Sequence, residues 1–157
     1  MKATRLRWFL LFLLAIDVCQ LPAQQSEADS TLLADIRAKA EKGDAQSQFE
    51  LGKAFYLGSH GVVKNDVESA KWYRKAAEQN DAQAQFNLGV CYANGEGVAK
   101  DYAEGYKWIL LAAGQGSEFA KKALATVEGM MTPEQIAEGQ KLARNFRPRQ
   151  VPASGGR

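Results

Sequence analysis

One stretch of the sequence is repeated, and this repeat restricts the possible folds more than any other feature. The copies begin at Ala45 and Ala82 and agree at aromatic, leucine, glycine and alanine positions. A repeat of this length is typical of stacked supersecondary units that share one core. We therefore expect a solenoid with repeats at about 45–80 and 82–116. The pairs are Ala45/Ala82, Phe49/Phe86, Leu51/Leu88, Gly52/Gly89 and Phe55/Tyr92 before an internal loop, and Gly61/Gly97, Val62/Val98, Trp72/Trp108, Ala76/Ala112 and Ala77/Ala113 after it.

Each copy predicts two antiparallel helices, which we call helix A and helix B. Small and apolar residues in the first half of each copy follow the 3.6-residue helical period. A Gly-x-Gly-Val-type segment then predicts the turn. Helix B has its own start signal, Asn65 with Glu68 in the first copy and Asp101 with Glu104 in the second. Each pair fits a capping box, and such a cap stabilises a helix by about 0.5–2 kcal/mol.

Two glycines lie inside the predicted helices A, at Gly52 and Gly89. A glycine in a helix costs about 1 kcal/mol relative to alanine. Because this cost is repeated at the same position, we expect another backbone to approach closely there. The paired alanines of helix B offer a second small surface, and Trp72, Tyr73 and Trp108 are expected to fill the groove between units.

The repeated motif resembles the Sel-one-like repeat (SLR) family, a relative of the tetratricopeptide repeat. The resemblance rests on Ala-x-x-Gln-Phe-x-Leu-Gly, the Gly-x-Gly-Val loop, Lys-Trp and the Ala-Ala pair, and it covers about half of the chain. It implies an all-α, TPR-like α-solenoid of antiparallel helix pairs that acts mainly as a protein-binding scaffold. It does not name a partner.

Residues 1–23 are predicted to be a signal peptide. Lys2, Arg5 and Arg7 precede an apolar run at 8–16, and residues 21–23 offer a cleavage site. The run is short for a bilayer span, although an uncleaved anchor is an alternative, as is lipoprotein processing at Cys19. We expect an exported bacterial protein, periplasmic or secreted. Without this segment, the 20 basic and 18 acidic residues become 17 of each, so no nucleic-acid partner is expected.

The flanks of the repeats are predicted to cap the stack, which gives a repeat domain over residues 30–147. Residues 24–29 are expected to form a flexible N-terminus, and Ser30 to start a helix that takes the place of a preceding helix B. Atypical terminal units are common in solenoids. Residues 117–147 predict two C-terminal capping helices, the second opened by Thr132 and Gln135 as a capping box. Residues 148–157 predict a disordered basic tail that is solvated or, alternatively, contacts an anion.

Residues able to carry chemistry are few. The single histidine, His60, lies in the predicted loop of the first copy without partners spaced for catalysis. Cys91 is the one cysteine outside the predicted signal peptide, and it aligns with Ala54, which favours an inert packed thiol over a reactive one. No catalytic residue, cofactor, metal site or small-molecule substrate is predicted.

The predicted binding surface is the groove lined by helices A. Phe49 and Phe86 could instead pack between helices, and this alternative stays open. The occupant is expected to be a peptide or one helix of a partner protein, whose aromatic contacts would dominate the binding energy. The groove residues are Gln46, Phe49, Lys53, Tyr56, Gln83, Phe86, Val90 and Ala93.

The sequence therefore favours a non-catalytic exported adaptor or scaffold. Two alternatives remain. One is a hydrolase of the β-lactamase type ascribed to cysteine-rich relatives, although this chain lacks their repeated cysteines. The other is a structural subunit of an envelope assembly.

Overall fold

A computed structural model describes residues 27–150, and this part of the chain is entirely helical apart from its turns and its C-terminal end. Residues 27–41 form the first helix. The predicted signal peptide at 1–23 lies outside the described residues. None of the helices within 27–150 combines the length and the apolar run needed to cross a membrane. The other helices are α2 (Ala45–Leu57), α3 (Asp66–Glu78), α4 (Ala82–Asn94), α5 (Tyr102–Gly114), α6 (Glu118–Glu128) and α7 (Pro133–Asn145).

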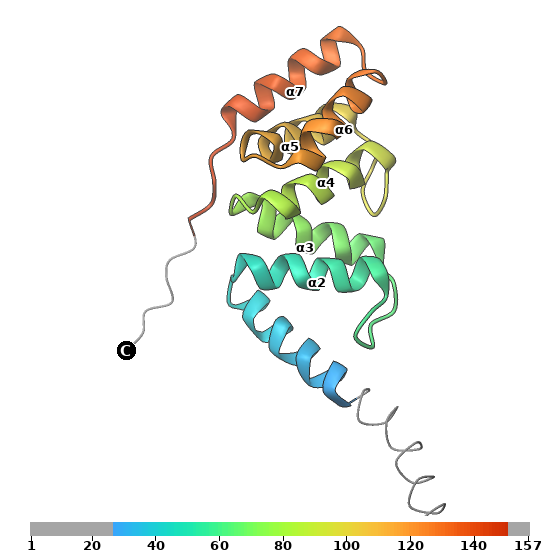
Figure 1. Ribbon diagram of the computed structural model, residues 1–157, viewed down its shortest axis with the longest axis vertical. Helices are drawn as coiled ribbons and strands as arrows, with labels where there is room; N and C mark the ends of the chain where they lie inside the picture. Colours follow the sequence, from blue (N-terminus) through green and yellow to red (C-terminus); the bar gives the residue numbers. More distant parts are fainter. Residues whose placement is uncertain (1–26, 151–157) are drawn as a thin grey trace, which may run out of the picture.

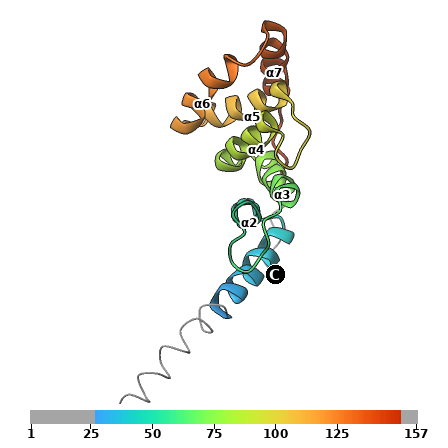
Figure 2. The same ribbon diagram turned by 90° about the vertical axis from the view of Figure 1, so that its right-hand side faces the viewer.

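The helices stack in chain order, from the N-terminal helix at one end to α7 at the other (Figures 1 and 2). Helix α2 pairs with α3 and α4 pairs with α5, so each repeat forms one antiparallel pair. The two pairs join through α3 and α4, and α5 contacts both α6 and α7. The prediction of an all-α, TPR-like solenoid is confirmed.

Side-chain caps determine where the helices begin. Asp44 and Asp81 accept the N–H groups of Ser47 and Ala84 at the starts of α2 and α4. Asn65 and Asp101 cap α3 and α5 as predicted. The predicted reciprocal bond from the glutamate is not formed there, because Glu68 and Glu104 pair with lysines one turn on. The capping box of Thr132 and Gln135 is complete.

The left-handed residues that follow three helices show that the N-terminal helix belongs to the stack. Gly43, Asn80 and Gly116 have φ angles of 100°, 72° and 93°, and they follow the N-terminal helix, α3 and α5 respectively. A side chain with a Cβ is strained in this conformation, which glycine adopts freely and asparagine tolerates. The first helix thus ends as a helix B does, which agrees with the prediction that it takes the place of a preceding helix B.

Close packing at the repeated glycines is confirmed. A Cβ on Gly52 would lie 2.7 Å from Cδ1 of Tyr73, and one on Gly89 would lie 2.5 Å from Cγ1 of Ile109 and 2.9 Å from the Gly105 carbonyl oxygen. These distances are shorter than van der Waals contact. Glycine is therefore required where each helix A crosses its own helix B.

Aromatic and aliphatic side chains fill the interior between the units. Trp72 packs with Ala40 and Leu51 beneath the N-terminal helix. Ile109, fully buried in α5, lies in a cluster that α6 and α7 complete through Ala120, Val127 and Ile136. Helices α6 and α7 thus cover α5, which agrees with their predicted role as C-terminal caps.

A pair of glutamines joins each repeat to the helix before it, and the sequence analysis did not identify this contact. Gln48 and Gln85 are buried, and their amides donate to the carbonyl oxygens of Ala40 and Ala77 at 3.0 and 3.3 Å. A second glutamine then donates to each of them at 2.7 Å, Gln79 to Gln48 and Gln115 to Gln85.

Both ends of the repeat domain differ from the prediction. Residues 27–29 are already helical, and Ser30 Oγ donates to the Glu27 carbonyl within the helix instead of capping it. The flexible segment predicted at 24–29 and the start at Ser30 are therefore wrong for these residues, because apolar positions at Leu33 and Ile36 pack on the stack and support the preceding turn. Residues 151–157 of the predicted tail lie outside the described residues.

The described part of the predicted tail is anchored. The Arg149 N–H donates to the Glu78 carbonyl at 2.7 Å, and its guanidinium lies 3.2 Å from the Glu78 carboxylate. Phe146 packs edge-on against Trp108, with ring centroids 5.4 Å apart. Of the two expectations for the tail, the contact with an anion is the one seen at Arg149, whose partner is a side chain of its own domain.

Candidate protein-binding site

The structure places some of the predicted groove residues in the interior. Phe49 is buried and packs against Tyr73 with centroids 5.9 Å apart. Phe86 is half-buried and packs against the cluster of α5 and α6. For these two positions, packing between helices is the correct interpretation, because the ring of each is used by its own domain.

Other predicted groove residues are accessible but do not converge. Lys53 and Gln46 both reach Glu50, at 2.9 and 3.2 Å, so their polar groups are already used within α2. Gln83 is exposed and Ala93 is half-buried. None of these four lines the hollow at which Tyr56 and Val90 meet.

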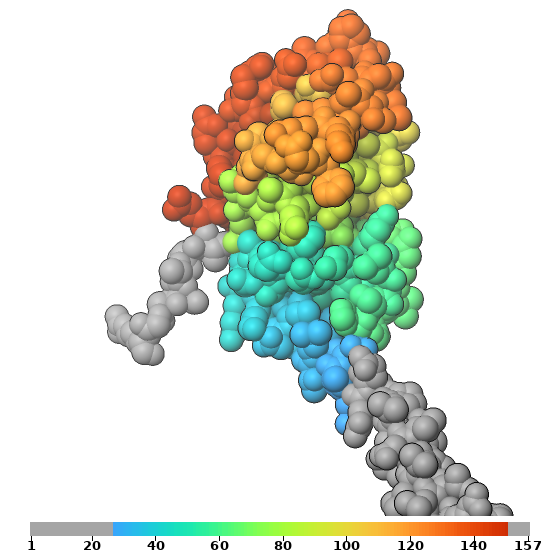
Figure 3. Space-filling model, viewed as in Figure 1, coloured from blue at the N-terminus to red at the C-terminus, as the bar shows by residue number. Residues whose placement is uncertain are grey.

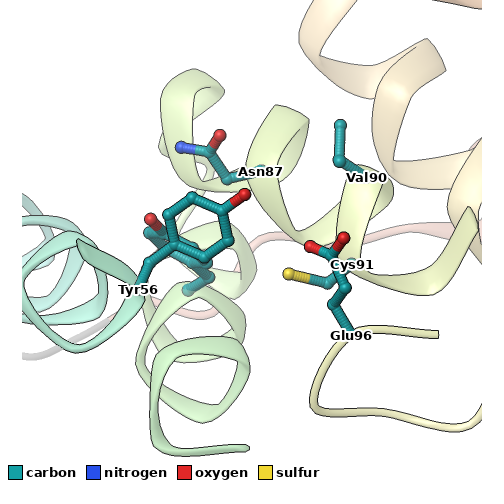
Figure 4. A pocket seen from close by; sticks show the side chains of 6 residues that line it. Tyr56, Asn87, Val90, Cys91 and Glu96 are labelled. Carbon is teal, nitrogen blue, oxygen red and sulfur yellow. The ribbon is translucent and has the colours of Figure 1, made fainter. Parts of the chain in front are cut away.

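Tyr56 and Val90 do converge, at a small hollow where α2, α3 and α4 meet. Its volume is about 60 Å³. Figure 4 shows the Tyr56 ring reaching toward Asn87, while Cys91 and Glu96 lie together across the opening. We call it the helix-A hollow, and it is lined by Tyr56, Tyr73, Asn87, Val90, Cys91 and Glu96.

Four of the residues that line the helix-A hollow were not predicted as site residues, among them Cys91, which was predicted only as a packed thiol. Asn87 lies one helical turn before Val90 and Cys91, so the helical period could have placed it on the same face. Tyr73 was predicted only as a packing residue between units. Glu96 follows α4, and no sequence pattern marks a loop side chain that folds back onto the preceding helix.

The Glu96 carboxylate favours a hydrogen-bond donor as the occupant of the hollow. Oε1 of Glu96 accepts a hydrogen bond from Asn94 at 3.1 Å, while Oε2 is buried without a hydrogen-bond partner. An unpaired buried acceptor is unfavourable, by about 1–3 kcal/mol. A hydrogen-bond donor from a partner would remove this penalty.

The chemistry of Cys91 does not suit a nucleophile. Burial, together with the nearby carboxylates of Glu96 and Asp66, raises the pKa of its thiol to about 11. A reactive cysteine needs the opposite, a lowered pKa next to a cation or a helix N-terminus. Burial also raises the pKa of the neighbouring Tyr73 hydroxyl. Both groups stay protonated and neutral at physiological pH.

His60 lies outside this site. The His60 ring lies 3.5 Å from the Asp29 carboxylate, so it connects the first loop to the N-terminal helix. No cluster of three or more His, Cys, Asp or Glu side chains within residues 27–150 could hold a metal ion. The helix-A hollow is also far smaller than the roughly 300–1,000 Å³ of a small-molecule pocket. The geometry suits the tip of one side chain from a partner.

Comparison with known proteins identifies the repeats. Residues 45–81 and 82–117 each match the Sel1 repeat family. The chain contains two Sel1 repeats. No curated protein matches it.

Two solved structures are similar to this protein. One is a protective antigen present in uropathogenic Escherichia coli strains and displaying an SLR fold; it is 26% identical over 86% of this chain, with a TM-score of 0.68. The other is a Sel1 repeat protein from Oxalobacter formigenes, 33% identical over 59% of this chain, with a TM-score of 0.57. The matches span 36% and 26% of those two chains, so both are considerably longer.

The raised pKa of Cys91 predicts how the stability of this protein depends on pH. The folded chain holds the thiol proton more tightly than the unfolded chain, whose thiol has a pKa near 9.0. This contribution to stability is complete below about pH 9 and is lost as pH rises toward 11. Between about pH 8 and 10.5, the wild type should lose up to about 2 kcal/mol more unfolding free energy than Cys91→Ala. Urea unfolding followed by circular dichroism measures the difference. Equal losses in the two chains would contradict a buried, protonated thiol.

Proposed function

We propose that this protein is a non-catalytic exported adaptor that binds a segment of another protein on the face formed by helices A. Sel1-repeat proteins are generally scaffolds for protein–protein interaction. Export is supported by the sequence of residues 1–23, with a basic start and an apolar run. The partner is a peptide or one helix of a larger protein.

One observation carries the proposal: an exposed aromatic ring and an unpaired acceptor meet at the helix-A hollow. Tyr56 is 38% exposed although it is large and apolar over most of its surface. Tyrosine is enriched among the residues that dominate protein interfaces, because its ring is rigid and its hydroxyl is polar. Glu96 supplies the acceptor beside it.

The hydrolase alternative has less support. It needs an activated side chain, and the burial and the neighbouring carboxylates act against a thiolate at Cys91. Nothing in the arrangement favours a structural subunit over an adaptor, so the adaptor is the simpler proposal.

Crosslinking in the native cell tests the proposal. A tagged full-length chain is compared with Tyr56→Ala/Val90→Asp, which removes the ring and places a charge at the hollow, and with Val63→Asp, which places the same charge on a loop residue that is 85% exposed. We expect the hollow variant to lose about tenfold or more of a crosslinked partner that the control retains. Circular dichroism establishes that the variants are folded. Equal capture by all three chains would refute this site.

A further inference from the structure

A second hollow lies between α3 and α5 and shares no residue with the helix-A hollow. Its volume is about 560 Å³, and we call it the α3–α5 groove. Arg74 and Glu78 line it from α3, Lys100 from the loop before α5, and Lys107 and Trp108 from α5. The groove therefore has charged walls, and the Trp108 ring that lines it is buried.

All three carboxylates of the α3–α5 groove are already engaged within the domain. Two of them form ion pairs, and the third caps α5 by accepting backbone N–H groups. The pairs are Glu78 with Arg149 at 3.2 Å, Glu104 with Lys107 at 3.1 Å, and Asp101 with the N–H groups of Ala103 and Glu104 at 2.9 and 3.1 Å.

Two of the cations are not neutralised. Within residues 27–150, neither Arg74 nor Lys100 forms an ion pair. Arg74 donates to the Tyr92 hydroxyl and lies over its ring, and Lys100 lies 4.7 Å from the centroid of the Tyr102 ring. These aromatic contacts orient both cations without cancelling their charge. Counting Arg149 at its edge, the groove has four cations against three carboxylates, an excess of one positive charge that favours an anionic ligand.

An extended segment of the chain itself lies at one end of this groove. After α7, residues 146–150 have no regular secondary structure and run back along one edge of the stack (Figures 1 and 3). Phe146 packs on Trp108, and the Arg149 N–H donates to the Glu78 carbonyl. This contact occupies the Glu78 carboxylate, which would otherwise repel an acidic ligand.

We propose that the α3–α5 groove binds an extended acidic segment of another protein. Arg74 and Lys100 bind its carboxylates. The proposal is separate from the function assigned to the helix-A hollow, because the two sites have no residue in common and can be altered one at a time.

The first repeat provides a matched control. Its equivalents of Arg74 and Lys100 are Arg37 and Lys64, at offsets of 37 and 36 residues. There Phe55 replaces Tyr92, which removes the hydroxyl that binds the arginine, and Lys64 is ion-paired with Asp66 at 3.4 Å. Reversing the charges of Arg37 and Lys64 changes the net charge equally but leaves the α3–α5 groove intact.

Fluorescence anisotropy with a labelled hexaglutamate peptide tests the proposal on the full-length chain. We expect Arg74→Glu/Lys100→Glu to raise the Kd about tenfold or more, and Arg37→Glu/Lys64→Glu to change it by less than about twofold. Hexaglutamine should not compete, and binding should weaken with salt. Tyr56→Ala/Val90→Asp should bind the peptide as the wild type does, which separates this result from the test of the helix-A hollow.

The outcomes that overturn the proposal are specific. An equal loss in the two charge-reversal variants would mean a general effect of net charge. If the chain is folded, as judged by circular dichroism, and does not bind hexaglutamate, the proposed site is refuted. The chain could instead bind duplex DNA, or vesicles rich in anionic lipid, through this groove without binding the peptide. That result would assign the cations to a different macromolecule and refute the proposal of an acidic protein segment.

Discussion

Replacing Gly89 with valine should lower the unfolding free energy by about 2–4 kcal/mol, because α4 and α5 could no longer pack together. The first carbon of the new side chain would already lie 2.5 Å from Cγ1 of Ile109 and 2.9 Å from the Gly105 carbonyl oxygen. A flexible side chain could move aside, but a backbone oxygen of a packed helix cannot. The loss exceeds the few tenths of a kcal/mol gained because valine has a better helix propensity than glycine.

The partner helix cannot relieve this clash. A Cβ on Gly105 would itself lie 3.0 Å from the Gly89 carbonyl oxygen, so the two backbones touch from both sides. Ile109 is fully buried and is held by the cluster that α6 and α7 complete. Separating α4 from α5 would therefore also disturb the C-terminal helices, and the whole stack should lose stability together.

Gly114 provides the control for this substitution. It is the last residue of α5, and a Cβ there would have no heavy atom within 4 Å. Gly114→Val should change the unfolding free energy by less than about 0.5 kcal/mol. Urea unfolding of both variants, followed by circular dichroism, makes the comparison. If Gly89→Val were no more destabilising than Gly114→Val, the crossing of α4 and α5 would not depend on glycine.

The close helix crossings at Gly52 and Gly89 could be predicted from the sequence, because both copies of the repeat accept the loss of helix stability that a glycine causes. A glycine in one helix has several explanations, but a glycine at equivalent positions in two copies requires a shared geometric reason. The same logic predicted that the first helix takes the place of a helix B, and the left-handed φ angles of Gly43 and Asn80 after the two helices agree with it. Repetition thus supplied the information that a single copy lacks.

Neighbouring residues of the same type could not be distinguished in this way. Gln46 is exposed and Gln48 is buried, and in the second copy Gln83 is exposed and Gln85 is buried. Both glutamines recur at equivalent positions, so the repeat itself does not say which one faces inward. The partner of each buried amide is a backbone carbonyl in the preceding helix B, and its identity depends on how the units stack.

The ends of the domain and the two hollows were harder to predict for a related reason. Arg149 reaches back to Glu78 only because α7 turns the chain along the edge of the stack. The helix-A hollow requires a loop residue, Glu96, to fold against α4. Contacts between segments far apart in the sequence follow from the three-dimensional arrangement, and no local pattern encodes them.

Replacing Gln85 with glutamate should lower the unfolding free energy by about 3 kcal/mol at neutral pH, although the two side chains have nearly the same size. Gln85 is fully buried, and its amide donates to the Ala77 carbonyl at 3.3 Å and to Oδ1 of Asn80 at 3.1 Å. A carboxylate would direct negative charge at both oxygens. Only Gln115, which donates to Gln85 Oε1 at 2.7 Å, would still find an acceptor.

The pH dependence separates this electrostatic effect from a packing defect. Burial and the two facing oxygens should raise the pKa of the new carboxyl group in the folded chain above its unfolded value of about 4.3. The variant should therefore be closest to the wild type below that pH, where the protonated carboxyl group can donate a hydrogen bond, and should lose stability as pH rises. Gln83→Glu places the same charge on the exposed face of α4 and should stay within about 0.5 kcal/mol of the wild type. If Gln85→Glu lost the same unfolding free energy at pH 4 and at pH 7, the buried glutamine would act through its shape. A loss of unfolding free energy that appears only as the carboxyl group ionises would establish that hydrogen bonds to the preceding helix B join the repeats.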